Sequence, residues 1–254
     1  MPAPPPESDA AIVRHRGTLV ARSDTPLAEA TIGRVARVAR YDGSAEWYDR
    51  VNAEQAPQAT RLAARLLGEG PGRLLDVGCG GGIHDRVLAE NGWSVLGVDI
   101  SDDQLRLARD RGVEVVEADA HELPFADGSF AAALSIFTHT DLDDFPTVVR
   151  EVARILEPGG RFVYVGGHPC FVGPHSRFPA ARGVPELHPG YWTVGRYTEA
   201  PGVTREGLRA RVGATHLPLG LFVQAFLDAG FQLERFEEPE QRLYPYMIAL
   251  RWRR

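Results

Sequence analysis

Apolar and polar positions in the middle of the chain predict a sheet covered by helices. Short apolar runs alternate there with amphipathic stretches. The runs are Arg73–Val77, Ser94–Val98, Glu114–Glu117, Phe130–Phe137 and Gly160–Val165, and the helical stretches between them are about Ile83–Asn91, Asp102–Arg111 and Asp144–Leu156. The runs are continuous rather than alternating, as expected for strands buried on both faces. The pattern predicts an α/β fold, Rossmann-like and doubly wound, with a mostly parallel sheet.

The flanking segments complete this architecture. Periodicity predicts helices at Thr25–Arg40, Ala45–Arg50, Glu54–Gly68 and Leu217–Ala229. Two further runs, Phe231–Glu238 and Tyr246–Arg253, predict an antiparallel hairpin at the sheet edge. The stretch 168–216 is rich in Pro, Gly, His and aromatic residues and lacks periodicity, which is typical of a lid insertion. We therefore expect an N-terminal tail and helix at 1–40 and one domain at 41–254 that carries the lid.

The strongest chemical signal is a glycine loop that follows the first predicted strand, in the run Leu74–Gly82. Glycine allows a tight turn and a close ligand approach, and the helix start beyond it offers free N–H groups to an anion. A dinucleotide loop needs a third glycine where this chain has Ile83, which disfavours NAD or FAD. Asp76, which closes the strand, fits S-adenosylmethionine (SAM) better.

Acidic residues also end the next two predicted strands. Asp99 ends the second strand and could accept hydrogen bonds from both hydroxyls of a ribose. Asp119 ends the third and could accept from an adenine amino group, while the N–H of Ala120 donates to a ring nitrogen. Ligands of open α/β sheets bind at the carboxyl ends of the strands, so we expect these residues to share one crevice with the glycine loop. Ser101 and Gln104 are expected to form a capping box.

Four ordered motifs together resemble the class I SAM-dependent methyltransferases, especially the small-molecule "methyltransferase type 11" group. They are Val77–Gly82, Gly97–Ser101, Leu123–Phe130 and Leu156–Gly160, and the resemblance covers about residues 41–166 and the final hairpin. It implies that the cofactor is SAM. It further implies that the cofactor is bound by Tyr41, Tyr48, Asp76, Gly78, Cys79, Gly80, Gly82, Asp99, Ile100, Asp119, Ala120 and Ser135.

Histidines are the candidate proton acceptors. His139 follows the fourth predicted strand, His168 follows the fifth, and His216 precedes the last long helix. A histidine with an ordinary pKa near ~6.5 can take a hydroxyl proton during methyl transfer. Hydrogen bonding within the lid is the alternative role of each. We expect no metal, because His168, Cys170 and His175 have irregular spacing and no evident fourth ligand.

The composition limits which binding partners and which location the sequence predicts. The 254 residues carry a net charge of −6, so nothing favours nucleic acid as the main partner. Two cysteines make no disulfide framework and no apolar run reaches the ~20 residues of a membrane helix, so we expect a soluble cytoplasmic protein. The sequence is compatible with both a monomer and a homo-oligomer. The predicted function is SAM-dependent methylation of a small-molecule acceptor, most simply O-methylation. N- or C-methylation, a SAM-binding protein that transfers no methyl group, and an NAD-dependent oxidoreductase are the alternatives.

Overall fold

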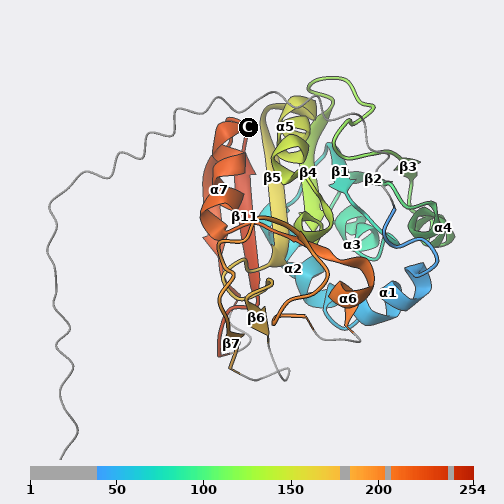
Figure 1. Ribbon diagram of the computed structural model, residues 1–254. Helices are drawn as coiled ribbons and strands as arrows, with labels where there is room; N and C mark the ends of the chain where they lie inside the picture. Colours follow the sequence, from blue (N-terminus) through green and yellow to red (C-terminus); the bar gives the residue numbers. More distant parts are fainter. Residues whose placement is uncertain (1–38, 178–183, 204–206, 240–242) are drawn as a thin grey trace, which may run out of the picture. The chain divides into compact units, whose positions relative to one another are not determined.

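A computed structural model describes residues 39–177, 184–203, 207–239 and 243–254 (Figure 1). The chain divides into two units, residues 1–36 and Arg37–Arg254, and the predicted helix Thr25–Arg40 lies almost entirely outside the described residues. The described residues all belong to the second unit.

The described residues form a seven-stranded sheet in the order β10-β11-β5-β4-β1-β2-β3. The strands are β1 (Arg73–Val77), β2 (Ser94–Asp99), β3 (Val115–Glu117), β4 (Phe130–Ile136), β5 (Leu156–Gly167), β10 (Gln232–Glu237) and β11 (Met247–Arg253). The first five pair in parallel, whereas β11 is antiparallel to both β5 and β10. The predicted Rossmann-like fold with an antiparallel C-terminal hairpin is confirmed.

Helices cover both faces of this sheet (Figure 1). They are α2 (Ala56–Leu67), α3 (Asp85–Glu90), α4 (Asp102–Asp110), α5 (Phe145–Ile155) and α7 (Leu219–Asp228), and α1 (Ala45–Asn52) packs against α4. On one face α5 and α7 pack onto β5 and β11, where the rings of Phe226 and Trp252 stack with centroids 4.5 Å apart. On the other face the apolar side of α2 packs against β1, β4 and β5. No helix in the described ranges has the length and apolarity needed to span a membrane.

Local sequence explains where the helices begin and end. The Asp144 side chain accepts a hydrogen bond from the Thr147 N–H at 3.2 Å and so caps α5. Ser101 caps α4 in the same way, through the Gln104 N–H at 3.3 Å. Gly68, with φ of +70°, ends α2 in a backbone conformation that favours glycine. The predicted boundaries therefore agree with the observed ones to within a few residues.

The predicted lid region contains only short elements within its described parts. These are β6 (Ser176–Arg177), β7 (Glu186–Leu187), β8 (Gly195–Tyr197), α6 (Leu208–Val212) and β9 (Ala214–His216). Two small antiparallel sheets, β6-β7 and β8-β9, hold them together. The short 3-10 helix η1 (His139–Asp141) contacts β9 and so joins this region to the end of β4.

Candidate functional site

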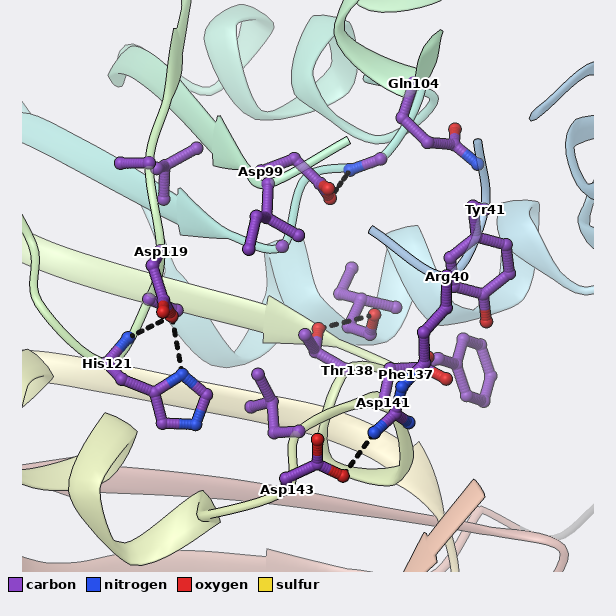
Figure 2. Close-up of a pocket in the computed structure, with 18 of the residues that line it drawn as sticks. Arg40, Tyr41, Asp99, Gln104, Asp119, His121, Phe137, Thr138, Asp141 and Asp143 are labelled. Atoms are coloured by element: carbon purple, nitrogen blue, oxygen red, sulfur yellow. Dashed lines mark hydrogen bonds and ion pairs between the residues drawn. The ribbon is translucent and has the colours of Figure 1, made fainter. Parts of the chain in front are cut away.

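A cavity of about 860 Å³, including its open mouth, lies at the carboxyl ends of β1, β2, β3 and β4. Figure 2 shows the residues around it. Eight of the predicted cofactor residues line this cavity: Tyr41, Tyr48, Gly78, Gly80, Asp99, Ile100, Asp119 and Ala120. The structure thus brings the glycine loop and the two acidic strand ends together in one crevice. This geometry arises because parallel strands present their carboxyl ends at the same edge of the sheet.

The glycine loop has a backbone that larger residues could not adopt. Gly78 and Gly80 have φ of +73° and +53°, the left-handed region that other residues avoid. A Cβ on Gly78 would overlap the methyl group of Thr138 and lie 3.1 Å from its hydroxyl oxygen. The loop therefore packs tightly against the residues that follow β4. Cys79 lines an adjoining hollow of about 340 Å³, whereas Gly82 packs against Ala108 and Val113 and lines neither space.

Asp99 is held in place by backbone donors. Its carboxylate accepts hydrogen bonds from the Gly80 N–H at 2.9 Å and from the Ser101 N–H at 3.0 Å. Burial raises the pKa of Asp99, and these N–H groups oppose that rise because they stabilise the charged form. A carboxylate accepts about four hydrogen bonds in all, and the Ile100 N–H is a third backbone donor to it, so Asp99 keeps room for a ribose hydroxyl.

Asp119 lines the far end of the same cavity, in contact with His121. Its Oδ1 accepts from the His121 N–H at 2.9 Å and lies 2.6 Å from the ring Nδ1 (Figure 2). The imidazole itself lines the cavity. Sequence reasoning missed His121, although its position two residues after a strand-end aspartate is where Asx turns place a neighbour.

Tyr41 and Tyr48 cover another side of the cavity, from the segment before α1 and from α1 itself. Their ring centroids are 4.4 Å apart with a 46° tilt. Burial, followed by the negative charge of Asp141, raises the pKa of both phenols, which keeps them neutral. Both tyrosines can therefore offer ring faces and neutral hydroxyl groups to a bound molecule.

Asp76 lies beneath the glycine loop rather than in the cavity wall. It faces Asp85 of α3, and no carboxyl oxygen of either residue has a hydrogen-bond partner outside the pair among the described residues. Burial and then the neighbouring charge of Asp85 raise the pKa of Asp76 well above its usual range, and burial raises that of Asp85 to about 6. Asp76 is not among the residues that line the cavity. Its expected contact with the cofactor stays a prediction.

Ser135 and His139 do not line the cavity. Ser135 is buried within β4, and the residues that reach the cavity from this strand and the loop after it are Ile136, Phe137 and Thr138. His139 packs among Phe145, Tyr164 and Phe222, and its Nδ1 hydrogen-bonds the Tyr164 hydroxyl. Burial lowers the pKa of His139 to about 3, so the ring is neutral near pH 7. The turn of η1 directs this side chain into the core, which the sequence position alone did not indicate.

His168 and His216 also have partners outside the cavity. His168 lies 2.8 Å from Glu238 through Nε2 and accepts from the Cys170 N–H through Nδ1. His216 lies 2.8 Å from the Tyr191 carbonyl oxygen through Nε2. Burial lowers the pKa of both rings. His216 thus contacts the lid, whereas His168 contacts both the lid and Glu238 beyond it, and neither ring lines the cavity. Their catalytic roles stay predictions.

Gln104 lines the cavity, although the sequence predicted only a helix-capping role for it. Its N–H does cap against Ser101, but its side chain makes no return hydrogen bond. The amide is 2 % exposed, and both its oxygen and its nitrogen lack hydrogen-bond partners in the described structure. It lies over Gly80, with Oε1 3.6 Å from where a Cβ would stand. A buried unpaired amide is costly, so this group is suited to a ligand with donors and acceptors.

A second set of cavity residues comes from the loop after β4. Asp141 lies in the wall and pairs with Arg209 of α6 at 3.3 Å, and Asp143 pairs with Arg40 (Figure 2). Burial raises the pKa of Asp141 against the opposing charge of Arg209. Phe137 has φ of +58°, which costs a non-glycine residue about 1–2 kcal/mol. Ion pairs across 68 and 103 residues of sequence leave no local signal, which is why sequence reasoning missed them.

The geometry fits an adenosine linked to an amino acid. Asp99 and Asp119 offer acceptors for ribose and adenine, the glycine loop allows close approach, and the unpaired amide of Gln104 adds a donor and an acceptor. No group of three or more His, Cys, Asp or Glu in the described ranges is arranged to hold a metal ion. Fold and cavity together define a Rossmann-like protein with a nucleotide-type cofactor site.

Comparison with known proteins shows what the chain is similar to. Residues 75–164 match the family described as "Methyltransferase domain". A crystal structure of an S-adenosylmethionine dependent methyltransferase from Mesorhizobium loti superposes with a TM-score of 0.63 at 26% identity, covering 84% of this chain and 99% of that one. Residues 75–164 therefore carry the likeness to a methyltransferase domain, and the fold of the chain is similar to that of a SAM-dependent methyltransferase.

Curated relatives match over shorter stretches. A demethylmenaquinone methyltransferase of Tropheryma whipplei (strain Twist) is 35% identical over 56% of this chain and 64% of its own length. A 27-O-demethylrifamycin SV methyltransferase of Amycolatopsis mediterranei (strain S699) is 38% identical over 45% of this chain and 47% of its own. The chain thus matches less than two thirds of the length of either protein.

Proposed function

We propose that this protein binds SAM in the cavity and transfers its methyl group to a small-molecule acceptor, most simply to an oxygen. The observation that supports this proposal best is the meeting of Gly78, Gly80, Asp99 and Asp119 in one cavity, with Tyr41 and Tyr48 along its side. The small-molecule class of acceptor is supported by the names of the matched relatives. A cytoplasmic location is consistent with two free cysteines, Cys79 and Cys170.

The residues of this chain would divide the work as follows. Asp99 would bind a ribose hydroxyl, and Asp119 with the Ala120 N–H would bind the adenine edge. Gly78 and Gly80 would let the amino-acid portion of SAM approach the backbone. The side-chain amide of Gln104 would form hydrogen bonds with the polar groups of that portion. When bound, SAM supplies an activated sulfonium methyl group. The protein's contribution is then positioning and exclusion of water, which supplies up to ~7–11 kcal/mol in favourable systems.

Asp141 replaces the histidines as the group best placed to accept a proton from the acceptor. β4 lies next to β1 in the sheet, so the loop that follows β4 flanks the glycine-loop end of the cavity. The Asp141 carboxylate lies in that wall with its pKa raised by burial, and a raised pKa makes it a better base than an exposed aspartate. His139, His168 and His216 would act by holding the core and lid in place.

Titration calorimetry tests the cofactor assignment. We expect the protein to bind SAM and S-adenosylhomocysteine and to show no measurable affinity for NAD⁺. Radiolabelled methyl transfer to a panel of phenols, carboxylic acids and amines then tests the reaction itself. Binding of NAD⁺ in preference to SAM would refute the proposal. Tight SAM binding with no transfer to any acceptor class would favour a member of the fold that does not methylate.

A further inference from the structure

A smaller hollow of about 340 Å³ adjoins the cavity at the glycine loop, and His84 forms part of its wall at the start of α3. The residues that line both spaces are Tyr48, Gly78, Gly80, Gln104 and Ile136. The sheet order is β4-β1-β2-β3, so a cofactor with its adenine at β3 and its ribose at β2 has its amino-acid end at β1. The hollow lies at that end, beside the loop that follows β1.

The ring of His84 is held by Thr60 of α2. Its Nδ1 lies 2.7 Å from the Thr60 hydroxyl oxygen, and that hydroxyl donates to the Ala56 carbonyl oxygen, also at 2.7 Å. Because the single hydroxyl proton goes to Ala56, Nδ1 must carry a proton and donate it to Thr60. Burial lowers the pKa of His84 to about 4, so the ring is neutral near pH 7 and its Nε2 carries a lone pair.

The Nε2 atom of His84 is directed away from Thr60 and remains accessible. It makes no hydrogen bond within the described residues, and unlike the carboxyl oxygens of Asp76 and Asp85 it is not fully buried. The residue as a whole is only 5% exposed, and the hollow is the space that it lines. The hollow therefore contains a neutral acceptor that is oriented by the protein and lacks a donor.

We propose that His84 is a cofactor-binding residue whose Nε2 accepts a hydrogen bond from the α-ammonium group of SAM. An ammonium group can only donate and this nitrogen can only accept, so the two are complementary, whereas the α-carboxylate would face the lone pair unfavourably. Asp49, a carboxylate in the same wall, is already paired with Arg111 at 2.7 Å, so His84 supplies an acceptor that is not engaged elsewhere. The inference rests on the proposed function and adds a residue to the cofactor site.

Three ligands test this role by titration calorimetry. They are S-adenosylhomocysteine, its analogue with hydrogen in place of the α-amino group, and its analogue with hydrogen in place of the α-carboxylate. In His84→Phe the affinity for the two ligands that keep the amine should fall at least about tenfold, the value of one hydrogen bond to a charged group, while the affinity for the des-amino analogue stays within about twofold. The matched control is His188→Phe, which replaces an exposed lid histidine and should leave all three affinities unchanged.

The pattern across the three ligands separates ammonium binding from mere support of the loop. An equal loss of all three affinities in His84→Phe would mean that the ring only holds the loop, and would overturn the inference. A loss confined to the ligands that keep the carboxylate would overturn it as well. Unchanged affinities would remove His84 from the site and leave the cofactor assignment intact. If the wild-type protein bound none of the three, the proposed function itself would fail, and the inference with it.

A measurement on the unaltered protein removes dependence on the folding of the variant. In ¹⁵N-histidine-labelled protein, the His84 signals among those of the eight histidines should show a protonated Nδ1 and a bare Nε2. The Nε2 resonance should move on addition of S-adenosylhomocysteine, and move much less with the des-amino analogue. His84→Phe identifies the resonance by its disappearance. A protonated Nε2 in the free protein, or equal shifts with the two ligands, would overturn the inference.

Discussion

The strand-end half of the site and the lid half differ in how their polar side chains are used. At the ends of β1, β2 and β3, the acidic residues Asp99 and Asp119 and the glycine loop line a cavity. Several buried polar atoms nearby have no hydrogen-bond partner among the described residues. In and beside the lid, His139, His168 and His216 already have partners within the protein. Residues that follow strand ends are directed to one edge by the sheet, whereas residues in irregular loops are directed by whatever packs against them.

The glycine loop offers the strongest way to test this contrast. Gly78→Ala should weaken S-adenosylhomocysteine binding by at least about 100-fold, because the new Cβ overlaps Thr138 and displaces the loop. Gly112→Ala is the matched control, with φ of +78° against +73° but with nothing within 4 Å of the added carbon. It should cost about 1 kcal/mol of stability and leave binding unchanged. Equal effects on binding in calorimetry would contradict the importance of close packing here.

Asp141 should matter more for stability than Asp143, although both lie in the same loop and pair with arginines. Asp141→Asn leaves Arg209 without its carboxylate, and because the Asp141 side chain is only 17% exposed, losing this charged hydrogen bond should cost about 1.5–3 kcal/mol. Asp143 is 57% exposed, so Asp143→Asn should cost below about 1 kcal/mol. Urea unfolding measures both, and adding Arg209→Met to Asp141→Asn should recover part of the loss. Identical unfolding curves for the two single variants would refute the difference in burial.

Asp99 carries the next largest expected effect on the cofactor. Asp99→Ala removes the charged acceptor at the ribose position and should reduce S-adenosylhomocysteine affinity by about 10- to 100-fold. Asp110→Ala, at the exposed end of α4, is the control and should bind as the wild type does. Calorimetry decides, and an affinity for Asp99→Ala within twofold of the wild type would remove Asp99 from the site.

His139 should affect acid stability and leave cofactor binding almost unchanged. The His139 pKa of about 3 in the folded protein lies below the usual histidine value of 6.5, so the unfolded chain takes up the proton first as the pH falls. The stabilisation is complete above pH 6.5 and is lost toward pH 3, by about 2 kcal/mol at pH 5. His139→Phe should lose less stability than the wild type between pH 7 and pH 5 in urea titrations. A large loss of S-adenosylhomocysteine affinity in this variant would instead return His139 to the site.

The sequence predicted the site correctly where the functional residues follow strand ends that the sheet brings to one edge. The run Leu74–Gly82 predicted a strand, a turn and a helix, and the sheet order then brought Asp99 and Asp119 to the same edge as Gly78. It did not find Asp141 with Arg209 or Arg40 with Asp143, because these pairs join segments that are far apart in the chain. It also assigned Gln104 to a cap, since a capping pattern does not reveal whether the side chain turns back to the backbone.

The sequence by itself determined the order of strands and helices, the glycine loop and the acidic strand ends, because hydrophobic periodicity and turn chemistry act over a few residues. Only the tertiary structure decided which polar groups remain unpaired in the cavity and which are satisfied elsewhere. His121 and Gln104 point to the cavity and His139 to the core for the same physical reason. Each side chain's environment is set by elements distant in the chain, and burial there decides whether its polar atoms find partners.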